Sequence, residues 1–217
     1  MDRVRVLSAD VAQLIAAGEV VERPASVIKE LVENSIDAGA TVIRVDIEAG
    51  GVRLMRVTDN GCGMTSRDAQ TCFLRHATSK IQTADDISGV ITLGFRGEAL
   101  ASIAAVSRVR LVTRTESAIE GTRVCMEGGV LIENESIGAP VGTSITIEDL
   151  FYNTPARKKF LKSERSEAGA IGALMDRLAL SHPEISFRFQ NNGKEELYTP
   201  GDGQILSAVS AVLGAQS

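Results

Sequence analysis

The chain has 217 residues, of which 44% are hydrophobic and 24% are charged, the balance of an ordinary globular protein. This length suits one large domain, or one domain followed by part of another. The formal net charge is −5, which excludes a domain that binds nucleic acid through a strong overall positive charge, although it allows a local basic patch.

Cysteine and histidine are sparse, and neither residue type has the spacing of a metal site. Cys62, Cys72 and Cys125 are odd in number and far apart, which predicts reduced thiols in a cytosolic protein. The first residues lack a basic segment followed by an apolar one, and no apolar run approaches about 18 residues. We therefore expect a soluble, non-secreted protein that has no contact with membranes.

The first half of the chain predicts helices around one β-hairpin. Ser8 caps a short helical pattern, and Pro24 stands where the first turn of a helix tolerates proline. In chain order we expect a helix over 8–19, a helix over 24–37, a hairpin of 42–50 with 52–59, a helix near 66–76 and a helix from about 96.

The second half predicts strands, one long helix and another hairpin. We expect strands within 107–115, 121–129, 130–136 and 142–150, a helix over 155–183, and a hairpin over 185–199 that turns at Asn192 and Gly193. This irregular alternation predicts an α+β fold, with a mixed, mostly antiparallel sheet covered by helices on one face. Residues 1–200 are expected to form one domain, and 201–217 to begin a following subdomain.

The helix over 24–37 gathers polar side chains on one face. At 100° per residue, Asn34 lies about 40° from Glu30, while Asp37 and Glu33 lie about 20° and 60° away in the other direction. The apolar side chains fall on the opposite side, at Ile28, Leu31, Val32 and Ile36. The polar face is compatible with ordinary solvated surface, or with a site in which Glu30 and Asn34 together hold a water molecule and a metal ion.

Two glycine-rich stretches are candidate ligand loops. In "DNGCGM" (59–64), Asp59 ends a predicted strand, and Gly61 and Gly63 permit close approach of the backbone to a ligand. "LGFRGEAL" (93–100) leads into a helix, whose unpaired N–H groups suit a phosphate. Plain turns are the alternative for both stretches. The sequence has no P-loop motif and no dinucleotide fingerprint after a strand, so a nucleotide would need another architecture.

Taken in order, these motifs resemble those of the GHKL (Bergerat-fold) ATPases, which have a two-layer α/β sandwich. The resemblance rests on Glu30 with Asn34 as E-x-x-x-N, on Asp59 with its glycines as D-x-G-x-G, on the glycine-rich stretch, and on Gly142 with Thr143. Within that superfamily, "GFRGEAL" (94–100), "RHATSK" (75–80), "FYNTPARKKFL" (151–161) and residues 15–40 are similar to the MutL mismatch-repair family. Type II topoisomerase ATPase subunits, Hsp90 chaperones and sensor histidine kinases are the alternatives within the superfamily.

The resemblance implies a role for each matching residue. Glu30 is the general base for the attacking water, Asn34 is a ligand of Mg²⁺, and Asp59 accepts a hydrogen bond from the adenine amino group, supported by Thr143. The residues around the base are Gly61, Gly63 and Met64; those of the lid are Thr78, Ser79 and Lys80; those around the phosphates are Gly94, Arg96, Gly97, Glu98, Ala99 and Leu100.

The implied function is a Mg²⁺-dependent ATPase that hydrolyses slowly and acts as a switch in DNA mismatch repair. ATP would drive self-dimerisation in the full-length protein, ADP would be the product, and a MutS-type mismatch recognition protein would be a partner in the bacterial cytosol, with the protein at the nucleoid when active. A lysine from the following subdomain reaches the γ-phosphate in that family, so we expect weak or no hydrolysis from these residues alone. A nucleotide-gated binding module with little turnover is the alternative, and a phosphate-release assay separates the two.

A basic run follows the last predicted strand of the middle group. It holds five basic residues within nine positions, against one acidic residue, Glu164. They are Arg157, Lys158, Lys159, Lys162 and Arg165. The run is either a solvated helix face or a patch that contacts DNA phosphates; given the net charge, DNA binding by these residues alone is expected to be weak.

Overall fold

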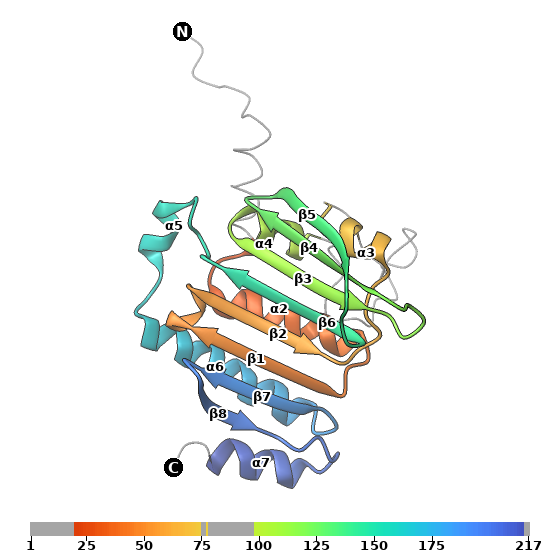
Figure 1. Cartoon of the computed structure of the whole chain (residues 1–217). Helices are drawn as coiled ribbons and strands as arrows, with labels where there is room; N and C mark the ends of the chain where they lie inside the picture. The colour runs from red at the N-terminus through yellow and green to blue at the C-terminus, as the bar shows by residue number, and fades with distance from the viewer. Residues whose placement is uncertain (1–19, 75–76, 78–97, 215–217) are drawn as a thin grey trace, which may run out of the picture.

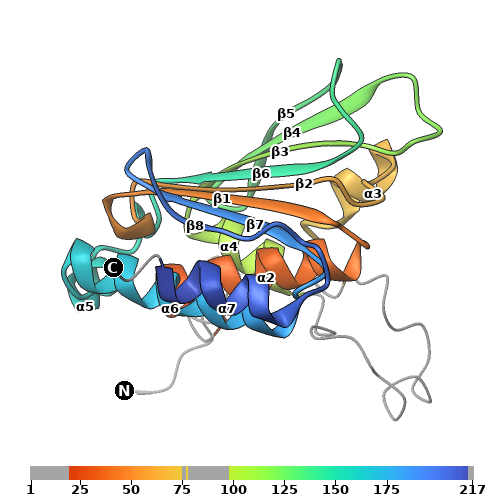
Figure 2. The same cartoon turned by 90° about the horizontal axis from the view of Figure 1, so that it is seen from below.

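The computed structural model describes residues 20–74, 77 and 98–214, and it forms two layers (Figures 1 and 2). One layer is an eight-stranded sheet with the strand order β5-β4-β3-β6-β2-β1-β7-β8. β1 (Val42–Glu48) pairs in parallel with β7 (Ser186–Asn191), and the other neighbouring pairs are antiparallel. Figure 2 shows the long helices on one face of this sheet. The predicted α+β sandwich with a mixed, mostly antiparallel sheet is therefore confirmed.

The remaining elements follow the expected order. The other strands are β2 (Leu54–Asp59), β3 (Arg108–Arg114), β4 (Gly121–Glu127), β5 (Val130–Ile137), β6 (Gly142–Glu148) and β8 (Lys194–Tyr198). The helices are α2 (Pro24–Asp37), α3 (Ser66–Thr71), α4 (Ala99–Ala105), α5 (Pro155–Phe160), α6 (Glu164–Ser181) and α7 (Ile205–Gly214), with a short 3-10 turn η1 (Ala49–Gly51). Both predicted hairpins are confirmed, and α3 is shorter than expected. The helix predicted over 8–19 lies outside the described residues.

The single long helix predicted over 155–183 is wrong, because the chain leaves the helical conformation between α5 and α6. Leu161 has φ −64° and ψ 146°, and Ser163 has φ −60° and ψ 152°, both in the extended region. The Ser163 hydroxyl accepts a hydrogen bond from the Ser166 N–H at 3.3 Å, and the Glu167 Oε1 accepts one from the Lys162 N–H at 3.0 Å. These local caps replace helical hydrogen bonds, which the apolar periodicity alone does not reveal.

The core lies between the sheet and the helices. Alternate residues of β1 point toward the helices, and Ile43, Val45 and Ile47 are completely buried. The apolar stripe of α2 faces them, with Ile28 and Val32 also at zero exposure. Burying one such side chain contributes about 1.5–3 kcal/mol, so this contact fixes the position of α2 against the middle of the sheet.

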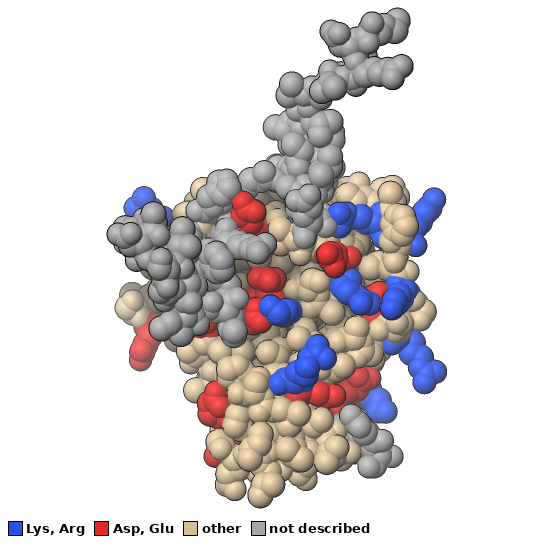
Figure 3. Space-filling view, turned by 180° about the vertical axis from the view of Figure 1, so that it is seen from behind, with Lys and Arg blue, Asp and Glu red and all other residues tan. Residues whose placement is uncertain are grey.

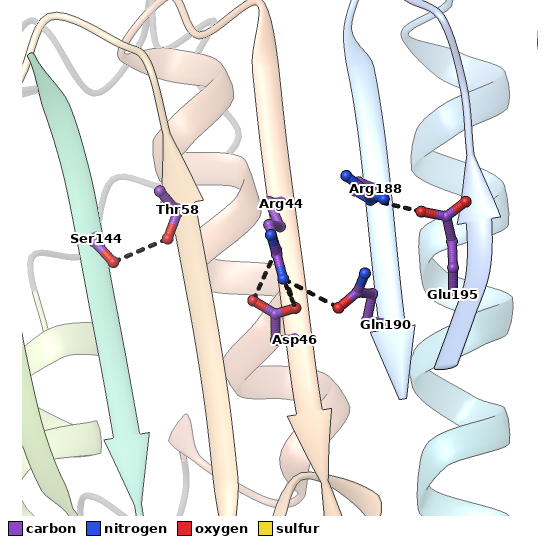
Figure 4. Close-up of polar contacts among 7 residues, drawn as sticks. All are labelled: Arg44, Asp46, Thr58, Ser144, Arg188, Gln190 and Glu195. Atoms are coloured by element: carbon purple, nitrogen blue, oxygen red, sulfur yellow. Dashed lines mark hydrogen bonds and ion pairs between the residues drawn. The ribbon is translucent and has the colours of Figure 1, made fainter. Parts of the chain in front are cut away.

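The opposite face of the sheet is polar (Figure 4). Arg44 donates from Nε to Asp46 Oδ1 at 3.0 Å and from Nη2 to Gln190 Oε1 at 3.0 Å, while the Thr58 and Ser144 hydroxyls lie 2.9 Å apart. The remaining pair in the view is Arg188 with Glu195. Exposed pairs of this kind contribute about 0–1 kcal/mol each, so they support the strand register rather than the core.

The C-terminal helix α7 packs on the same layer as the other helices. It contacts α6 and β8, burying Ala208 and Val212, while Leu206 is 77% exposed. The prediction that residues 201–217 begin a following subdomain stays a prediction. Across the described ranges, no helix combines the length and the apolar character needed to cross a membrane.

Candidate functional site

The end of β2 holds a carboxylate that three different segments contact. Asp59 Oδ2 accepts a hydrogen bond from the Ser35 hydroxyl of α2 at 2.8 Å. Asp59 Oδ1 accepts from the Gly61 N–H at 2.9 Å and from the Thr143 N–H at 3.2 Å. A carboxylate has about four acceptor positions, so these three bonds leave about one position, on Oδ2, for a donor from a ligand.

Burial and hydrogen bonding act on this carboxyl in opposite directions. Burial raises the pKa of Asp59, because an ionised carboxylate loses hydration there, and this is the largest effect. The bonds from Gly61, Ser35 and Thr143 lower the same pKa, because each favours the ionised form. A polar group that is desolvated yet oriented by its neighbours is typical of a recognition site.

Glycine is required where the loop after Asp59 and the strand β6 approach their neighbours. At Gly63 φ is +68°, and a Cβ would lie 2.1 Å from the Arg114 carbonyl oxygen. At Gly142 φ is +114°, and a Cβ would lie 2.2 Å from the Asp59 carbonyl oxygen. Neither position has room for a side chain, because each backbone lies against another segment of the protein; the predicted close approach to a ligand stays a prediction.

A buried threonine that the motifs did not indicate joins the same segments. Thr113 on β3 is 1% exposed, and its Oγ1 accepts a hydrogen bond from the Met64 N–H at 2.9 Å. The same hydroxyl donates to the Gly142 carbonyl at 3.0 Å and lies 3.0 Å from Thr143 Oγ1. Thr113 thus connects β3, the glycine loop and β6 behind Asp59.

Ser35 and Thr113 did leave a signal in the sequence. Ser35 follows Ile28, Leu31 and Val32 at helical spacing, so it is a hydroxyl within an apolar stripe. Thr113 occupies the same side of β3 as the buried Val109 and Leu111, as shown by the alternating burial of that strand. A hydroxyl at a core position needs a partner, and here both partners belong to the site.

The polar face of α2 divides into separate parts. Glu30 and Asn34 are half-buried, and Asp37 is exposed. Glu33 is only 6% exposed and its Oε2 lies 2.8 Å from Lys29 Nζ, so this part of the polar face is not solvated surface. The face therefore presents Glu30 and Asn34 one turn apart, while the lysine on the preceding turn neutralises the buried Glu33.

The start of α2 is anchored by a buried carboxylate. Arg23 donates from Nε and Nη2 to Glu167 Oε2 at 3.1 and 3.0 Å, and the Lys162 N–H donates to Glu167 Oε1 at 3.0 Å. Glu167 is 1% exposed. This network joins the residue before α2 to α6, so it holds the helix that carries Glu30 and Asn34.

The predicted phosphate loop is described only at its end. Glu98, Ala99 and Leu100 are half-buried at the start of α4, and the Glu98 carbonyl accepts from the Ser102 N–H at 2.9 Å. α4 contacts α2 beneath the sheet (Figure 2). The remaining predicted residues of the loop and of the lid lie outside the described residues: Thr78, Ser79, Lys80, Gly94, Arg96 and Gly97.

The other end of α4 is held by the turn over 149–154. The Phe151 N–H donates to the Val106 carbonyl at 2.7 Å, and Asn153 Nδ2 donates to the Ala105 carbonyl at 2.8 Å. Phe151 is completely buried although its φ is +65°. A non-glycine residue with positive φ is uncommon, so this turn is set by its packing against α4.

The basic run lies on α5 and just beyond it. Arg157 has a structural role, because its Nη1 donates a hydrogen bond to the Val21 carbonyl at 3.0 Å. The other four basic side chains are exposed: Lys158, Lys159, Lys162 and Arg165. On the face in Figure 3, basic and acidic side chains are interspersed rather than separated into fields of one sign.

Comparison with known proteins agrees with this geometry. The family described as "Histidine kinase-, DNA gyrase B-, and HSP90-like ATPase" matches residues 22–129. The DNA mismatch repair protein MutL of Desulforudis audaxviator is 55% identical over 215 residues, which are 99% of this chain and 38% of that protein. MutL of Trichlorobacter lovleyi is 56% identical over 200 residues, covering 92% of this chain and 34% of that protein.

Two solved structures extend the comparison. The Aquifex aeolicus MutL ATPase domain complexed with ADP has a TM-score of 0.72 and 35% identity, with 90% of this chain and 70% of that chain covered. The N-terminal domain of a DNA repair protein has a TM-score of 0.79 and 27% identity, with 94% and 61% covered. The fold and these matches define the class: an ATPase domain of the GHKL type. The chain belongs to the MutL family of DNA mismatch repair, and it spans about a third of the length of the curated relatives given above.

Proposed function

We propose that the chain binds ATP with Mg²⁺, hydrolyses it slowly, and thereby acts as a conformational switch in DNA mismatch repair. The arrangement of Asp59 carries this proposal, because three segments orient its carboxylate and leave an acceptor position on Oδ2. A relative of the same family is complexed with ADP, which supports a nucleotide as the ligand.

The adenine amino group is the proposed donor to Asp59 Oδ2. Thr143 adjoins the same carboxylate and supports recognition of the base. Gly61, Gly63 and Met64 form the loop alongside, which packs closely on β3 and α2, and its backbone is proposed to approach the base. A purine with a hydrogen-bond donor at this edge is therefore preferred.

Glu30 and Asn34 are the proposed hydrolytic residues. Glu30 would orient and deprotonate the water that attacks the γ-phosphate, as a half-buried carboxylate on the same helix face as Asn34. The Asn34 amide oxygen is a hard donor, the type that Mg²⁺ accepts, and Asn34 stands one turn from Glu30. Mg²⁺, when bound, would neutralise charge on the phosphate oxygens.

The phosphates would lie toward the start of α4, where Glu98, Ala99 and Leu100 begin the helix beside α2. Gly94, Arg96 and Gly97 are proposed to continue this phosphate loop, and Thr78, Ser79 and Lys80 to form the lid. These assignments rest on the family motif at each position.

The wider role is also a proposal. ATP binding is expected to drive self-dimerisation of the full-length protein in the cytosol and to coordinate a MutS-type mismatch recognition protein, with DNA contacted mainly through other regions. Order–disorder switching by a γ-phosphate is a known mechanism for such changes. Residues 1–217 alone are expected to turn over ATP weakly.

Titration of the chain with a non-hydrolysable ATP analogue and Mg²⁺, followed by thermal unfolding, tests the binding step. A ligand at about 100 times its Kd stabilises the folded state by about 2.7 kcal/mol, so a clear rise in Tm is expected. Asp59→Asn should abolish most of this rise, while Glu30→Ala should keep it. Absence of any rise in the wild type would contradict the proposal.

A phosphate-release assay on the full-length protein tests the hydrolytic step. The wild type is expected to release phosphate slowly, and Glu30→Ala to stop release while retaining affinity. If the wild type binds ATP but releases none, the chain is a nucleotide-gated binding module instead of an ATPase switch.

A further inference from the structure

The two edges of the sheet differ in their side chains (Figure 1). The edge strand β8 has five residues, of which Lys194, Glu195 and Glu196 are exposed, and α7 packs against it. A short strand, charged side chains and a covering helix are the usual protections of an edge against pairing with another chain. The β8 edge is therefore protected.

The opposite edge strand, β5, begins with apolar side chains instead. It has eight residues, and the first three, Val130, Leu131 and Ile132, are 63%, 50% and 63% exposed. These three positions hold no charged residue and no proline. Among the described strands only β4 pairs with β5, so the backbone groups on the other side of β5 are open to a further strand.

The register of β5 on β4 shows which side chains an added strand would meet. Leu131 pairs with Met126 of the core, and Val130 pairs with Glu127, which points to the opposite face of the sheet. The register shifts at this point, so Ile132 is an extra residue between two paired ones. Apolar side chains therefore flank both faces of this end of the edge.

The second half of β5 carries more negative than positive charge. Glu133 and Glu135 lie at alternate positions of the strand and so on one face. They share one cation, Arg123, whose Nη2 lies 3.2 Å from Glu133 Oε1 and also pairs with Glu135. These three side chains together carry one net negative charge, which basic side chains on an added strand would complement.

We propose that the β5 edge is an interaction surface for an extended segment of another protein, which adds to the sheet as an antiparallel strand and carries basic side chains followed by apolar ones. Antiparallel pairing continues the arrangement of β5, β4, β3 and β6. The basic half of the segment would lie against Glu135 and Glu133, and the apolar half against 130–132. In this mode of recognition main-chain hydrogen bonds give affinity, and alternate side chains give specificity. A second copy of β5 brings the same carboxylates and no countercharge, so it fits this edge less well.

A synthetic peptide with the sequence Thr-Lys-Thr-Lys-Val-Ile-Val has the required chemistry. Its binding to the full-length protein, followed by fluorescence anisotropy, should be saturable. Two further peptides carry N-methyl groups, one at the odd and one at the even backbone amides, and only one of these sets faces β5 in an antiparallel pair. One of the two should therefore bind about tenfold more weakly or worse, and the other like the unmodified peptide. Equal binding of all three peptides, or no binding of the unmodified one, would overturn the proposal.

Val130→Lys combined with Ile132→Lys tests the surface itself. Both side chains are more than half exposed, so the variant should keep the Tm of the wild type. Affinity for the unmodified peptide should fall about tenfold, because apolar contacts are lost and like charges are brought together. Tyr198→Lys, at a 55% exposed position of β8, is the matched control and should leave this affinity unchanged. The same affinity loss in both variants, or no loss in either, would contradict recognition by β5.

The choice of occupant has its own test. Sedimentation of the full-length protein without nucleotide or peptide measures its self-association. An association that Val130→Lys with Ile132→Lys abolishes would identify a second copy of the chain as the occupant of the β5 edge, and would overturn the proposal of a different protein. Unchanged sedimentation of this variant, together with the loss of peptide binding, supports it.

Discussion

Around Asp59, each buried polar side-chain atom of Ser35, Thr113 and Thr143 has a hydrogen-bond partner. The turn over 149–154 at the far end of α4 differs. Asp149 and Phe151 have φ of +53° and +65°, and the buried atoms Asn153 Oδ1 and Thr154 Oγ1 have no partner within the described part of the chain.

This difference gives separate properties to the two regions, the surroundings of Asp59 and the turn over 149–154. The region around Asp59 is preformed, because its hydroxyl and backbone groups are already hydrogen-bonded, and preformed sites lose little entropy on binding. The turn holds backbone conformations that cost about 1–3 kcal/mol each, and such costs are sustained only where the surrounding packing enforces them. We expect substitutions near Asp59 to change nucleotide selectivity, and substitutions in the turn to change stability.

Gly142→Ala is expected to have the largest effect, because it disturbs the packing of β6 against Asp59. Its Cβ would lie 2.2 Å from the Asp59 carbonyl oxygen at a φ of +114°. Relief of this clash requires β6 to move away from β2. We therefore expect a loss of about 3 kcal/mol or more in the free energy of unfolding, and no detectable ATP binding. Urea denaturation and nucleotide titration measure the two effects.

Gly138→Ala is the matched control for that substitution. Gly138 lies between β5 and β6, and a Cβ there would meet nothing within 4 Å. Its unfolding free energy should stay within about 0.5 kcal/mol of the wild type. Equal losses in the two variants would show that the tight approach at Gly142 is not what supports the site.

Ser35→Ala is expected to have the next largest effect. It removes a hydrogen bond to a charged group, which contributes about 1.5–3 kcal/mol. Because burial already raises the pKa of Asp59, the native state binds a proton there more readily than the unfolded state, and stability falls as the pH rises above the usual range of aspartate. Without Ser35 that pKa rises further, so the fall with pH should become steeper.

Urea denaturation at about pH 7 and about pH 4 measures this dependence. The destabilisation by Ser35→Ala should be larger at the higher pH, where the carboxylate is ionised, and smaller once it is protonated. The same loss at both pH values would mean that Ser35 acts through packing and not through Asp59.

The sequence predicted the residues that lie on one element better than those that meet across elements. Helical period placed Glu30 and Asn34 on one face, and the strand pattern placed Asp59 at a strand end. The motifs do not indicate Ser35 and Thr113, because the partners of these residues, Asp59 and Gly142, come from strands whose register depends on the whole sheet. Periodicity gives the face of a residue, but its neighbour depends on pairing in three dimensions.

The error in the predicted elements has a local cause, and so does the burial of Glu33. The helix predicted over 155–183 is interrupted because Ser163 caps α6. A single serine within a long helical pattern does not by itself predict this interruption. Glu33 was compatible with surface on the helical wheel, yet the wheel does not show the depth of each position. Its burial depends on the packing of α2, and Lys29 supplies the neutralising charge.

Asn153→Asp is expected to have a smaller effect that is confined to the turn. The substitution keeps the shape and removes the donor to the Ala105 carbonyl, so a carboxylate oxygen would face a carbonyl oxygen. We expect a loss of about 2 kcal/mol in the free energy of unfolding, with Asn153→Ala near 1 kcal/mol because it also removes the unpartnered Oδ1. The affinity for the ATP analogue should stay as in the wild type; a changed affinity would contradict the separation of the turn from the surroundings of Asp59.

Combined substitution of Lys158, Lys159 and Lys162 by Gln should change stability least, within about 0.5 kcal/mol, because all three side chains are exposed. Arg157 is left in place, since it holds the Val21 carbonyl.

If the run binds DNA phosphates, full-length protein should bind DNA more weakly after this substitution. The slope of log K against log salt should then fall by about 0.9 for each phosphate that the variant no longer neutralises. Lys194→Gln, on the exposed edge strand β8, is the control and should leave both quantities unchanged. An unaltered salt slope in the triple variant would identify the run as a solvated surface.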